Sequence, residues 1–236
     1  MENSVRINKY LANQGLVSRR EADELIKTGR VRHNGARATL GAMVQPEDTV
    51  EIIGKRSNKR YFAYYKGRGI ITHSPGPEET DIATKIREDY GLTDVSPVGR
   101  LDKDSEGLII LTDDGRITRE LLKSENEHPR TYEVTVDKSI NNWFLKHMAQ
   151  GVRIEGYTTR PATITPATRN PKRFTLVLTE GKKHQIRRMC AALGYQVQSL
   201  KRTEIANIKL EKLKPNQYRK IAGKELQDLL STLHLR

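Results

Sequence analysis

A polar, charged stretch at residues 54–60 (Gly-Lys-Arg-Ser-Asn-Lys-Arg) separates two parts of the chain with different hydrophobic patterns. Before it, apolar residues recur at helical spacing. After it, short apolar runs alternate with Gly and Pro positions and with helical segments. The stretch itself has no periodicity. We therefore predict a small domain at 1–55, a linker at 56–60 and a larger domain at 61–236, which a chain of 236 residues can accommodate.

The first part predicts two helices followed by a small curled sheet. Ile7, Tyr10 and Leu11 lie at helical spacing, which indicates one helix. Ser18, with Glu21 three residues later, forms a capping-box pattern that begins a second helix. Short strand candidates follow at 31–33, 44 and 50–53, the first of them ending in an Asn-Gly turn.

The second part predicts many short strands. Strand candidates are 61–65, 70–72, 108–112, 132–136, 174–178, 197–200 and 205–210. Helix candidates are 82–90, 117–122, 141–149, 184–193 and 224–233. Because neighbouring strands are often joined without a helix between them, we predict an α+β fold. Its sheet is expected to be mixed and mostly antiparallel rather than doubly wound and parallel.

Basic residues are concentrated in one block. The chain has 42 Lys+Arg and 29 Asp+Glu, a formal net charge of +13 at pH 7. Residues 151–220 hold sixteen basic and four acidic residues, whereas residues 56–150 are close to neutral. A solvated surface explains scattered Lys and Arg, but a block with this bias favours a polyanionic partner. The charge pattern therefore predicts binding of nucleic acid.

Composition excludes several other classes of protein. No run approaches the roughly 18 consecutive apolar residues of a membrane span, and residues 1–8 contain no apolar signal core. The single cysteine, Cys190, cannot form an internal disulfide or a Cys-based zinc module. We expect a cytoplasmic globular protein with a basic surface, no membrane contact and no bound metal.

An acidic turn between residues 97 and 115 is the densest segment of the chain. Asp102, Asp104, Glu106 and Asp113 occupy positions 1, 3, 5 and 12 of a calcium-binding EF-hand template. That template needs a helix on each side, whereas Ser-Pro-Val-Gly precedes the turn and the run at 108–112 indicates a buried strand. Position 12 is also Asp rather than the usual Glu. We therefore reject a calcium site.

The sequence RINKYLANQGLVSRREADELIKTGRVRHNG at residues 6–35 resembles the S4 RNA-binding domain. In that family the start of the second helix and the following Gly-x-Val-x-x-Asn-Gly turn face RNA. The alternative is that Ser18 only caps a helix and that the arginines are solvated; both can hold, because a helix N-terminus is also an anion site. The candidate phosphate contacts that the resemblance implies are Arg6, Ser18, Arg19, Arg20 and Asn34.

The acidic turn resembles the catalytic motif of pseudouridine synthases of the RsuA/RluA superfamily, and the chain is most similar to their RluF branch. The turn reads Gly-Arg-Leu-Asp-Lys-Asp-Ser-Glu-Gly-Leu from Gly99, which places the catalytic aspartate of the motif at Asp102. Two further family motifs follow in order, Arg-Thr-Tyr at 130–132 and Gly-Lys-Lys-His-Gln-Ile-Arg-Arg-Met at 181–189.

The resemblance assigns roles to the residues at these positions. Asp102 is expected to act as a nucleophile or base at the sugar, with Arg187 beside it to keep it ionised. Tyr132 offers an aromatic face for the uracil, although a plain core position is its alternative. Ile186 is expected to form an apolar wall of the site. The residues expected to contact RNA there are Arg100, Leu101, Lys103, Arg130, His184 and Gln185.

The resemblance also implies a substrate. RluF-like enzymes convert a uridine of large-subunit (23S) ribosomal RNA to pseudouridine, and some members also act on a tRNA, without a metal or other cofactor. Two alternatives stay open: an RluB-like enzyme that acts on a neighbouring 23S uridine, and a non-catalytic S4-type RNA-binding protein. We expect a monomer with RNA as its partner.

Overall fold

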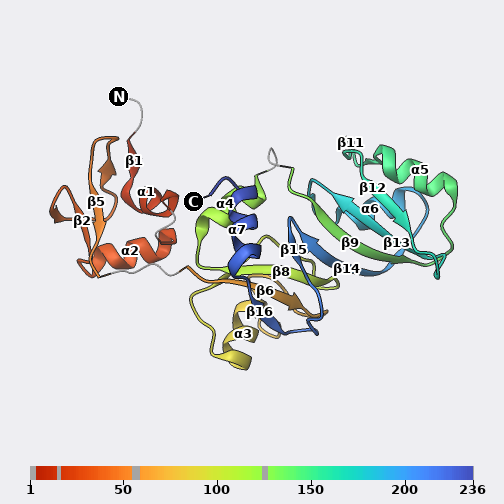
Figure 1. Ribbon diagram of the computed structural model, residues 1–236, viewed down its shortest axis with the longest axis horizontal. Coiled ribbons are helices and arrows are strands. Elements are labelled where there is room, and N and C mark those ends of the chain that lie inside the picture. Colours follow the sequence, from red (N-terminus) through yellow and green to blue (C-terminus); the bar gives the residue numbers. More distant parts are fainter. Residues whose placement is uncertain (1–3, 15–16, 55–58, 124–126, 236) are drawn as a thin grey trace.

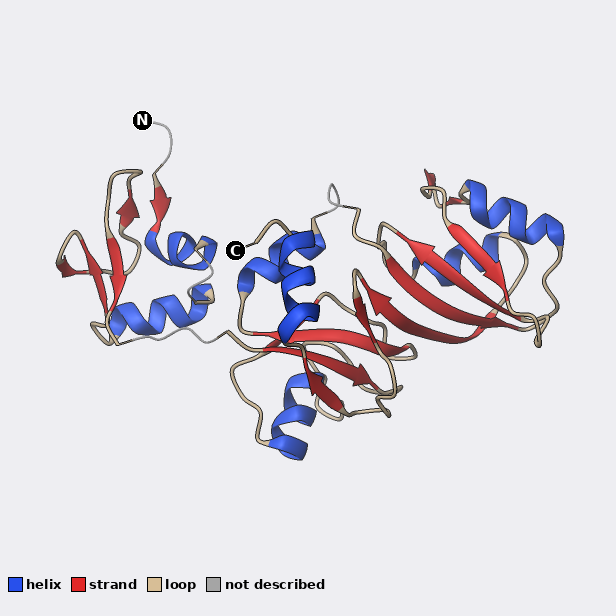
Figure 2. Cartoon of the chain, in the orientation of Figure 1, coloured by secondary structure: helices blue, strands red, loops and turns tan. Residues whose placement is uncertain are grey.

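One long sheet with helices on both faces makes up most of the molecule. The computed structural model describes residues 4–14, 17–54, 59–123 and 127–235. The chain is elongated, with a small N-terminal domain at one end (Figure 1) and the sheet running through the rest (Figure 2). Within the described ranges no helix is long and apolar enough to cross a bilayer. The predicted α+β fold with a mixed, mostly antiparallel sheet is confirmed.

The N-terminal domain packs two helices, α1 (Ile7–Asn13) and α2 (Arg19–Lys27), against short strands. The predicted capping box is present: the Glu21 backbone N–H donates to Ser18 Oγ over 3.1 Å, and the Ser18 N–H donates to Glu21 Oε2 over 3.4 Å. Asn34 takes a positive φ of 50° in the predicted turn. The strands are β1 (Val5–Arg6), β2 (Val31–His33), β3 (Ala36–Arg37), β4 (Met43–Val44) and β5 (Val50–Ile52).

The large domain is organised by its sheet, whose strands lie in the order β12-β13-β9-β14-β8-β6-β16. In addition, β7 pairs with β8 and β15 with β14. The β14–β8 pair is parallel, and the others are antiparallel. The strands are β6 (Tyr61–Lys66), β7 (Ser96–Val98), β8 (Glu106–Thr112), β9 (Arg130–Val136), β12 (Thr163–Pro166), β13 (Arg173–Leu178), β14 (Val197–Ile205), β15 (Ile208–Lys209) and β16 (Tyr218–Lys220).

One half of this sheet is covered on both faces. Every residue of β6 is buried, and so is β8 after its first residue, which explains their nearly continuous apolar sequences. Helix α3 (Ile82–Tyr90) packs on one face with Phe62 and Ile109. Helices α4 (Gly115–Leu122) and α7 (Gly223–Thr232) pack on the other face. This half carries the acidic turn, which lies between β7 and β8.

The other half consists of β12, β13, β9 and most of β14. Tyr132, Val134 and Val136 alternate along β9 as buried residues, so that strand has one core face. Helices α5 (Asn142–Gln150) and α6 (Gln185–Ala192) supply Phe144, Met148 and Met189 to the same core cluster. A small separate hairpin joins β10 (Arg153–Ile154) to β11 (Tyr157–Thr158). This half carries the two other motifs.

The five helices predicted in the large domain are present, with ends within two residues of those expected. The strand predicted at 70–72 is wrong: Ile71 makes an isolated bridge to Asp81, and its carbonyl accepts from the Ile82 N–H that opens α3. The strand predicted at 205–210 is also wrong, because the chain turns at Ala206, where φ is +50°, and returns as β15. Strands β7, β12 and β16 were not predicted, since they are short and lack a clear alternation.

The two domains meet at α1 and α4. Arg119 Nη1 on α4 donates to Asn13 Oδ1 on α1 over 2.8 Å. Residues 56–58 of the predicted linker lie outside the described residues. Arg60, the last residue of that stretch, is bound to the large domain, because its N–H and Nε donate to the Asp113 carboxylate over 2.9 and 3.1 Å. The S4-like domain is therefore in contact with a helix of the large domain.

Gly107 allows β14 to approach β8 closely. Its φ is +112°, and a Cβ added there would lie 2.2 Å from the Arg202 carbonyl oxygen. Both the conformation and the space require glycine. The parallel pair that joins the two halves of the sheet depends on this position.

We expect Gly107→Ala to lower the free energy of unfolding by about 3 kcal/mol, since a Cβ forces strain or displaces β14. Urea denaturation measures the effect. Gly115→Ala is the matched control: a Cβ there meets nothing within 4 Å, so a change below about 1 kcal/mol is expected. Equal losses of stability in the two variants would show that the backbone around Gly107 can shift at little cost to accommodate a Cβ.

Candidate active site

A cleft of about 760 Å³ lies where the two halves of the sheet meet. Its walls come from the acidic turn, the loop before α6, the inner side of α4 and the adjoining parts of β9 and β14. Three separate sequence motifs therefore converge on one hollow. The predicted site residues that line it are Arg100, Leu101, Asp102, Arg130, Tyr132, His184, Gln185 and Ile186.

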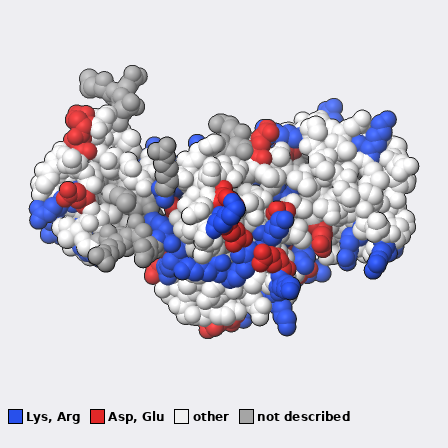
Figure 3. Space-filling view, in the orientation of Figure 1, with Lys and Arg blue, Asp and Glu red and all other residues white. Residues whose placement is uncertain are grey.

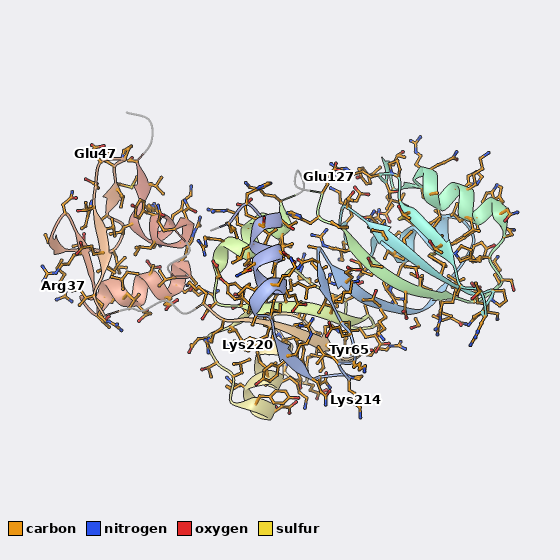
Figure 4. The ribbon with its side chains drawn as sticks, viewed as in Figure 1. Arg37, Glu47, Tyr65, Glu127, Lys214 and Lys220 are labelled. Carbon is orange, nitrogen blue, oxygen red and sulfur yellow. The ribbon has the colours of Figure 1, made fainter. Side chains whose placement is uncertain are left out.

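The acidic turn is fixed by hydrogen bonds to its backbone. The Leu101 carbonyl accepts from Thr72 Oγ1 over 2.8 Å, and the Leu101 N–H donates back to that hydroxyl over 3.0 Å. The Ser105 N–H donates to the Asp102 carbonyl over 3.0 Å. Tyr65, labelled in Figure 4, donates its hydroxyl to Glu106 Oε2 over 2.9 Å where β8 begins. These bonds fix the turn from which the Asp102 side chain lines the cleft.

A buried lysine lies beneath the turn. The Lys66 side chain is fully buried, and its Nζ donates to the carbonyls of Ser105, Gly67 and Lys103 over 2.7, 2.9 and 3.4 Å. Burial lowers the pKa of Lys66 to about 8, against the opposing effect of the Asp102, Asp104 and Glu106 carboxylates. Sequence reasoning missed this residue. A lone lysine at the end of an apolar strand was the available signal.

Arg187 contacts the backbone of the same turn. Its Nη2 lies 3.3 Å from the Asp104 carbonyl and 3.4 Å from Ser105 Oγ, and its Nη1 lies 3.3 Å from the Val197 carbonyl. Arg187 was expected beside the Asp102 carboxylate. In the part of the chain that the structure describes, the basic side chain nearest that carboxylate is instead His184, whose Nε2 lies 3.5 Å from Asp102 Oδ1. Arg187 thus ties α6 to the turn.

The loop before α6 is braced by a buried carboxylate. Glu180 accepts hydrogen bonds from the Tyr157 hydroxyl, the Arg160 N–H at 3.0 Å and Gln185 Nε2 at 2.6 Å. Gln185 Oε1 in turn accepts from the Lys182 N–H over 2.8 Å. Both ends of the Gln185 amide are therefore bonded within the protein. We infer that Gln185 shapes the loop and that its amide is not free to make the expected contact with RNA.

The inner wall combines an aromatic ring, an aliphatic side chain and arginines. Tyr132 and Ile186 are buried in one core cluster and both border the cleft. Arg130, two residues before Tyr132 on β9, donates from Nη2 to the Leu121 carbonyl over 2.7 Å. Burial and the nearby Arg202 lower the pKa of Arg130. Sequence reasoning missed Arg202 on β14, which pairs with Tyr132 and also lines the cleft.

The remaining predicted residues lie outside the cleft. Lys103 pairs with Glu79 over 2.7 Å. Ser18 caps α2, and the Asn34 side chain is bonded to Asp48 and to the Thr49 N–H. Arg6, Arg19 and Arg20 are exposed, and none takes part in an ion pair among the described residues. Figure 3 shows a band of Lys and Arg over the middle of the molecule as well.

We expect the stability of the protein to depend on pH through Lys66. Below pH 8 its ammonium is protonated in both the folded and the unfolded chain, so the full cost of burying the charge is present. Between pH 8 and 10 the folded protein loses the proton first. The unfolded chain then binds more protons, and stability rises with pH.

The comparison is with Lys66→Met, which lacks this titration. The free energy of unfolding of the wild type should gain about 2 kcal/mol over that of the variant between pH 8 and 10, measured by urea denaturation. The exposed Lys214, labelled in Figure 4, supplies the control Lys214→Met, for which no such pH dependence is expected. If the free energies of unfolding of wild type and Lys66→Met differ by the same amount at pH 8 and at pH 10, the pKa of Lys66 is not lowered.

Known families match both parts of the chain. A family model described as "RNA pseudouridylate synthase" matches residues 60–192, and one described as "S4 domain" matches residues 5–50. A solved structure described as "Crystal structure of pseudouridylate synthase" superposes with a TM-score of 0.70 at 27% sequence identity. That superposition covers 96% of this chain and 100% of the other.

Similar proteins extend over nearly the whole chain. The dual-specificity RNA pseudouridine synthase RluF of Escherichia coli (strain K12) is 38% identical over 238 residues, which cover 98% of this chain and 80% of that protein. The ribosomal large subunit pseudouridine synthase B of Bacillus subtilis (strain 168) is 34% identical over 232 residues, 95% of either chain. An uncharacterized RNA pseudouridine synthase of Aquifex aeolicus is 37% identical over 98% of this chain and 96% of its own length.

Proposed function

Because this chain belongs to the RNA pseudouridylate synthase family and is such an enzyme, we propose that it isomerises one uridine of large-subunit (23S) ribosomal RNA and, as a second substrate, a tRNA uridine. The relative with "dual-specificity" in its name supports the pair of substrates. The single observation that carries the proposal is the cleft that Asp102, Tyr132 and Ile186 line together. We place the enzyme in the cytoplasm as a monomer.

The reaction exchanges one bond of the nucleotide for another. The C1′–N1 bond breaks, the uracil turns, and a C1′–C5 bond forms; C5 gives up a proton and N1 gains one. The Asp102 carboxylate acts at the sugar as nucleophile or base. His184, 3.5 Å away, offers a cation or a hydrogen-bond donor to the same carboxylate. Asp102 thus carries the chemistry, with His184 as its neighbour.

The remaining cleft residues hold the base. The Tyr132 ring is a stacking face for the uracil, a contact of about 1–3 kcal/mol per base. Ile186 closes the wall so that the freed base stays in place while it turns. Arg100 is exposed at the rim, where it meets the phosphates of the flipped nucleotide. Extraction of a base from its stack costs a few kcal/mol, which these contacts offset.

The division of labour follows the domains, which we propose to be residues 1–55 and 61–236. The S4-like domain and the basic block at 151–220 bind the RNA backbone, and the cleft modifies the base. The hydrogen bond from Arg119 on α4 to Asn13 on α1 supports this division, because α4 also lines the cleft.

An RluB-like specificity is the second candidate. The large subunit pseudouridine synthase B of Bacillus subtilis matches 95% of this chain at 34% identity. Mapping of the modified nucleotide in 23S RNA, by reverse-transcription stops after carbodiimide treatment, separates this candidate from the first.

We expect Asp102→Asn to abolish the reaction, a loss of at least about 10⁴-fold, because the amide can act neither as nucleophile nor as base. The assay is release of tritium from ribosomal RNA that carries tritium at uridine C5. Asp104→Asn, two residues along the same turn, is the matched control and should keep activity within a few-fold. Release by neither the wild type nor Asp102→Asn favours the non-catalytic RNA-binding alternative, whereas equal release by both overturns the catalytic role of Asp102.

We expect Arg19→Ala with Arg20→Ala to weaken RNA binding and to lower its salt dependence. Two lost phosphate contacts should reduce the slope of log K against log salt by about 1.5–2. Filter binding at several salt concentrations measures this slope. Glu24→Ala with Lys27→Ala removes an ion pair of α2 without changing the net charge, and its slope should stay that of the wild type. An unchanged slope in the double arginine variant would place the RNA elsewhere.

A further inference from the structure

Arg202 is a buried arginine with an incompletely bonded guanidinium. It is 4% exposed, lies on β14 and borders the cleft. Its Nε donates to the Leu108 carbonyl over 2.8 Å, whereas the buried Nη2 has no hydrogen-bond partner within the described part of the chain. A buried donor without an acceptor destabilises the protein, and more so when it is charged. A ligand that supplies an acceptor would remove this cost.

The register of the sheet places Arg202 beside the stacking face. Arg202 on β14 lies directly opposite Tyr132 on β9, so both side chains lie on the same side of the sheet. Leu200 and Ile186 add apolar surface to that side. A flat base stacked on Tyr132 would therefore have apolar contacts over its faces and an arginine at one edge.

The chemistry of the guanidinium restricts what it can meet. Arginine has five N–H donors and no acceptor. The edge that faces Arg202 must therefore carry an acceptor. Uracil has two carbonyl oxygens, O2 and O4, whereas cytosine carries an amino donor in place of O4. An arginine at this edge suits a pyrimidine dione.

We propose that Arg202 donates a hydrogen bond to a carbonyl oxygen of the target uracil and stabilises the charge that develops on the base, an inference that rests on the proposed function. When C1′–N1 breaks with its electron pair going to N1, the uracil becomes an anion whose charge is shared with O2 and O4. A fixed cation at that edge, in a site shielded from water, favours this step. When C5 bonds to C1′, the C5 proton is lost and N1 is protonated, so the base leaves the step neutral.

The test combines Arg202→Gln with sulfur substitution in the RNA. The substrate is a stem-loop with uridine, 2-thiouridine or 4-thiouridine at the target position, and the single-turnover rate of C5-linked product is measured by nucleoside chromatography. Sulfur accepts hydrogen bonds poorly. We expect one of the two thio substrates to slow the wild type about tenfold. Arg202→Gln should be about 100-fold slower on uridine and show little further loss with that thio substrate.

Comparison of two rates within one protein keeps the test valid if the variant is partly unfolded, because the fraction of folded enzyme cancels. Arg202→Lys keeps the charge and should recover part of the uridine rate. Arg188→Gln is the matched control. Arg188 is partly buried and, like Arg202, has one guanidinium nitrogen, its Nε, without a hydrogen-bond partner among the described residues, but it lies outside the cleft. Its thio effect should equal that of the wild type.

Two failures are distinguishable. If the wild type forms no product from uridine, the proposed function fails. If the wild type is active but the thio effects in Arg202→Gln equal those of the wild type, Arg202 does not contact a uracil carbonyl. The missing hydrogen bond of Arg202 Nη2 is then a feature of the folded protein and not a contact reserved for the base.

Discussion

The two halves of the large sheet are joined where β14 runs parallel to β8, and the cleft exists because of this pairing. Only Lys201 and Arg202 pair with Glu106 and Gly107. The backbones approach so closely that Gly107 has no room for a side chain. One half brings the turn that carries Asp102, and the other brings Tyr132 and α6. Separation of the halves at this short pair would leave each with an incomplete site.

Three basic side chains, a lysine and two arginines, lie around the acidic turn on its protein side. Lys66 binds two of its carbonyls, those of Lys103 and Ser105, and Arg187 binds its backbone from α6. Arg202 lies on the strand that pairs with the start of β8. Two of these three belong to the basic block at 151–220, so that block contributes to the interior of the site as well as to its surface. The turn of acidic residues is thereby held by groups of opposite charge and by backbone hydrogen bonds.

Much of the fold was predictable because local patterns decided it. The five helices of the large domain follow apolar spacing and end signals such as Asp81 and Asn141, whose side chains cap α3 and α5. The capping box at Ser18 was readable for the same reason. Strand β16 was not, since its pairing partner β6 is remote in sequence and supplies the hydrogen bonds that make it a strand. Strand β12 pairs with the neighbouring β13 but is short and lacks a clear alternation. The segment at 70–72 carries strand-forming residues, but its backbone is bonded to the loop before α3.

The candidate site also has a part that the sequence predicted and a part that it did not. Motifs in the sequence were enough to identify Asp102, Tyr132 and Ile186 as candidate site residues, and all three line the cleft. The side chains that contact Asp102, and those that support the turn that carries it, became visible in the folded structure alone. His184 rather than Arg187 is the basic side chain nearest its carboxylate among the described residues. Lys66 on β6 binds the backbone of the turn, and Arg202 on β14 lines the cleft. The physical reason is that burial and long-range strand pairing, which fix the partners of a charged group, depend on residues far apart in the chain.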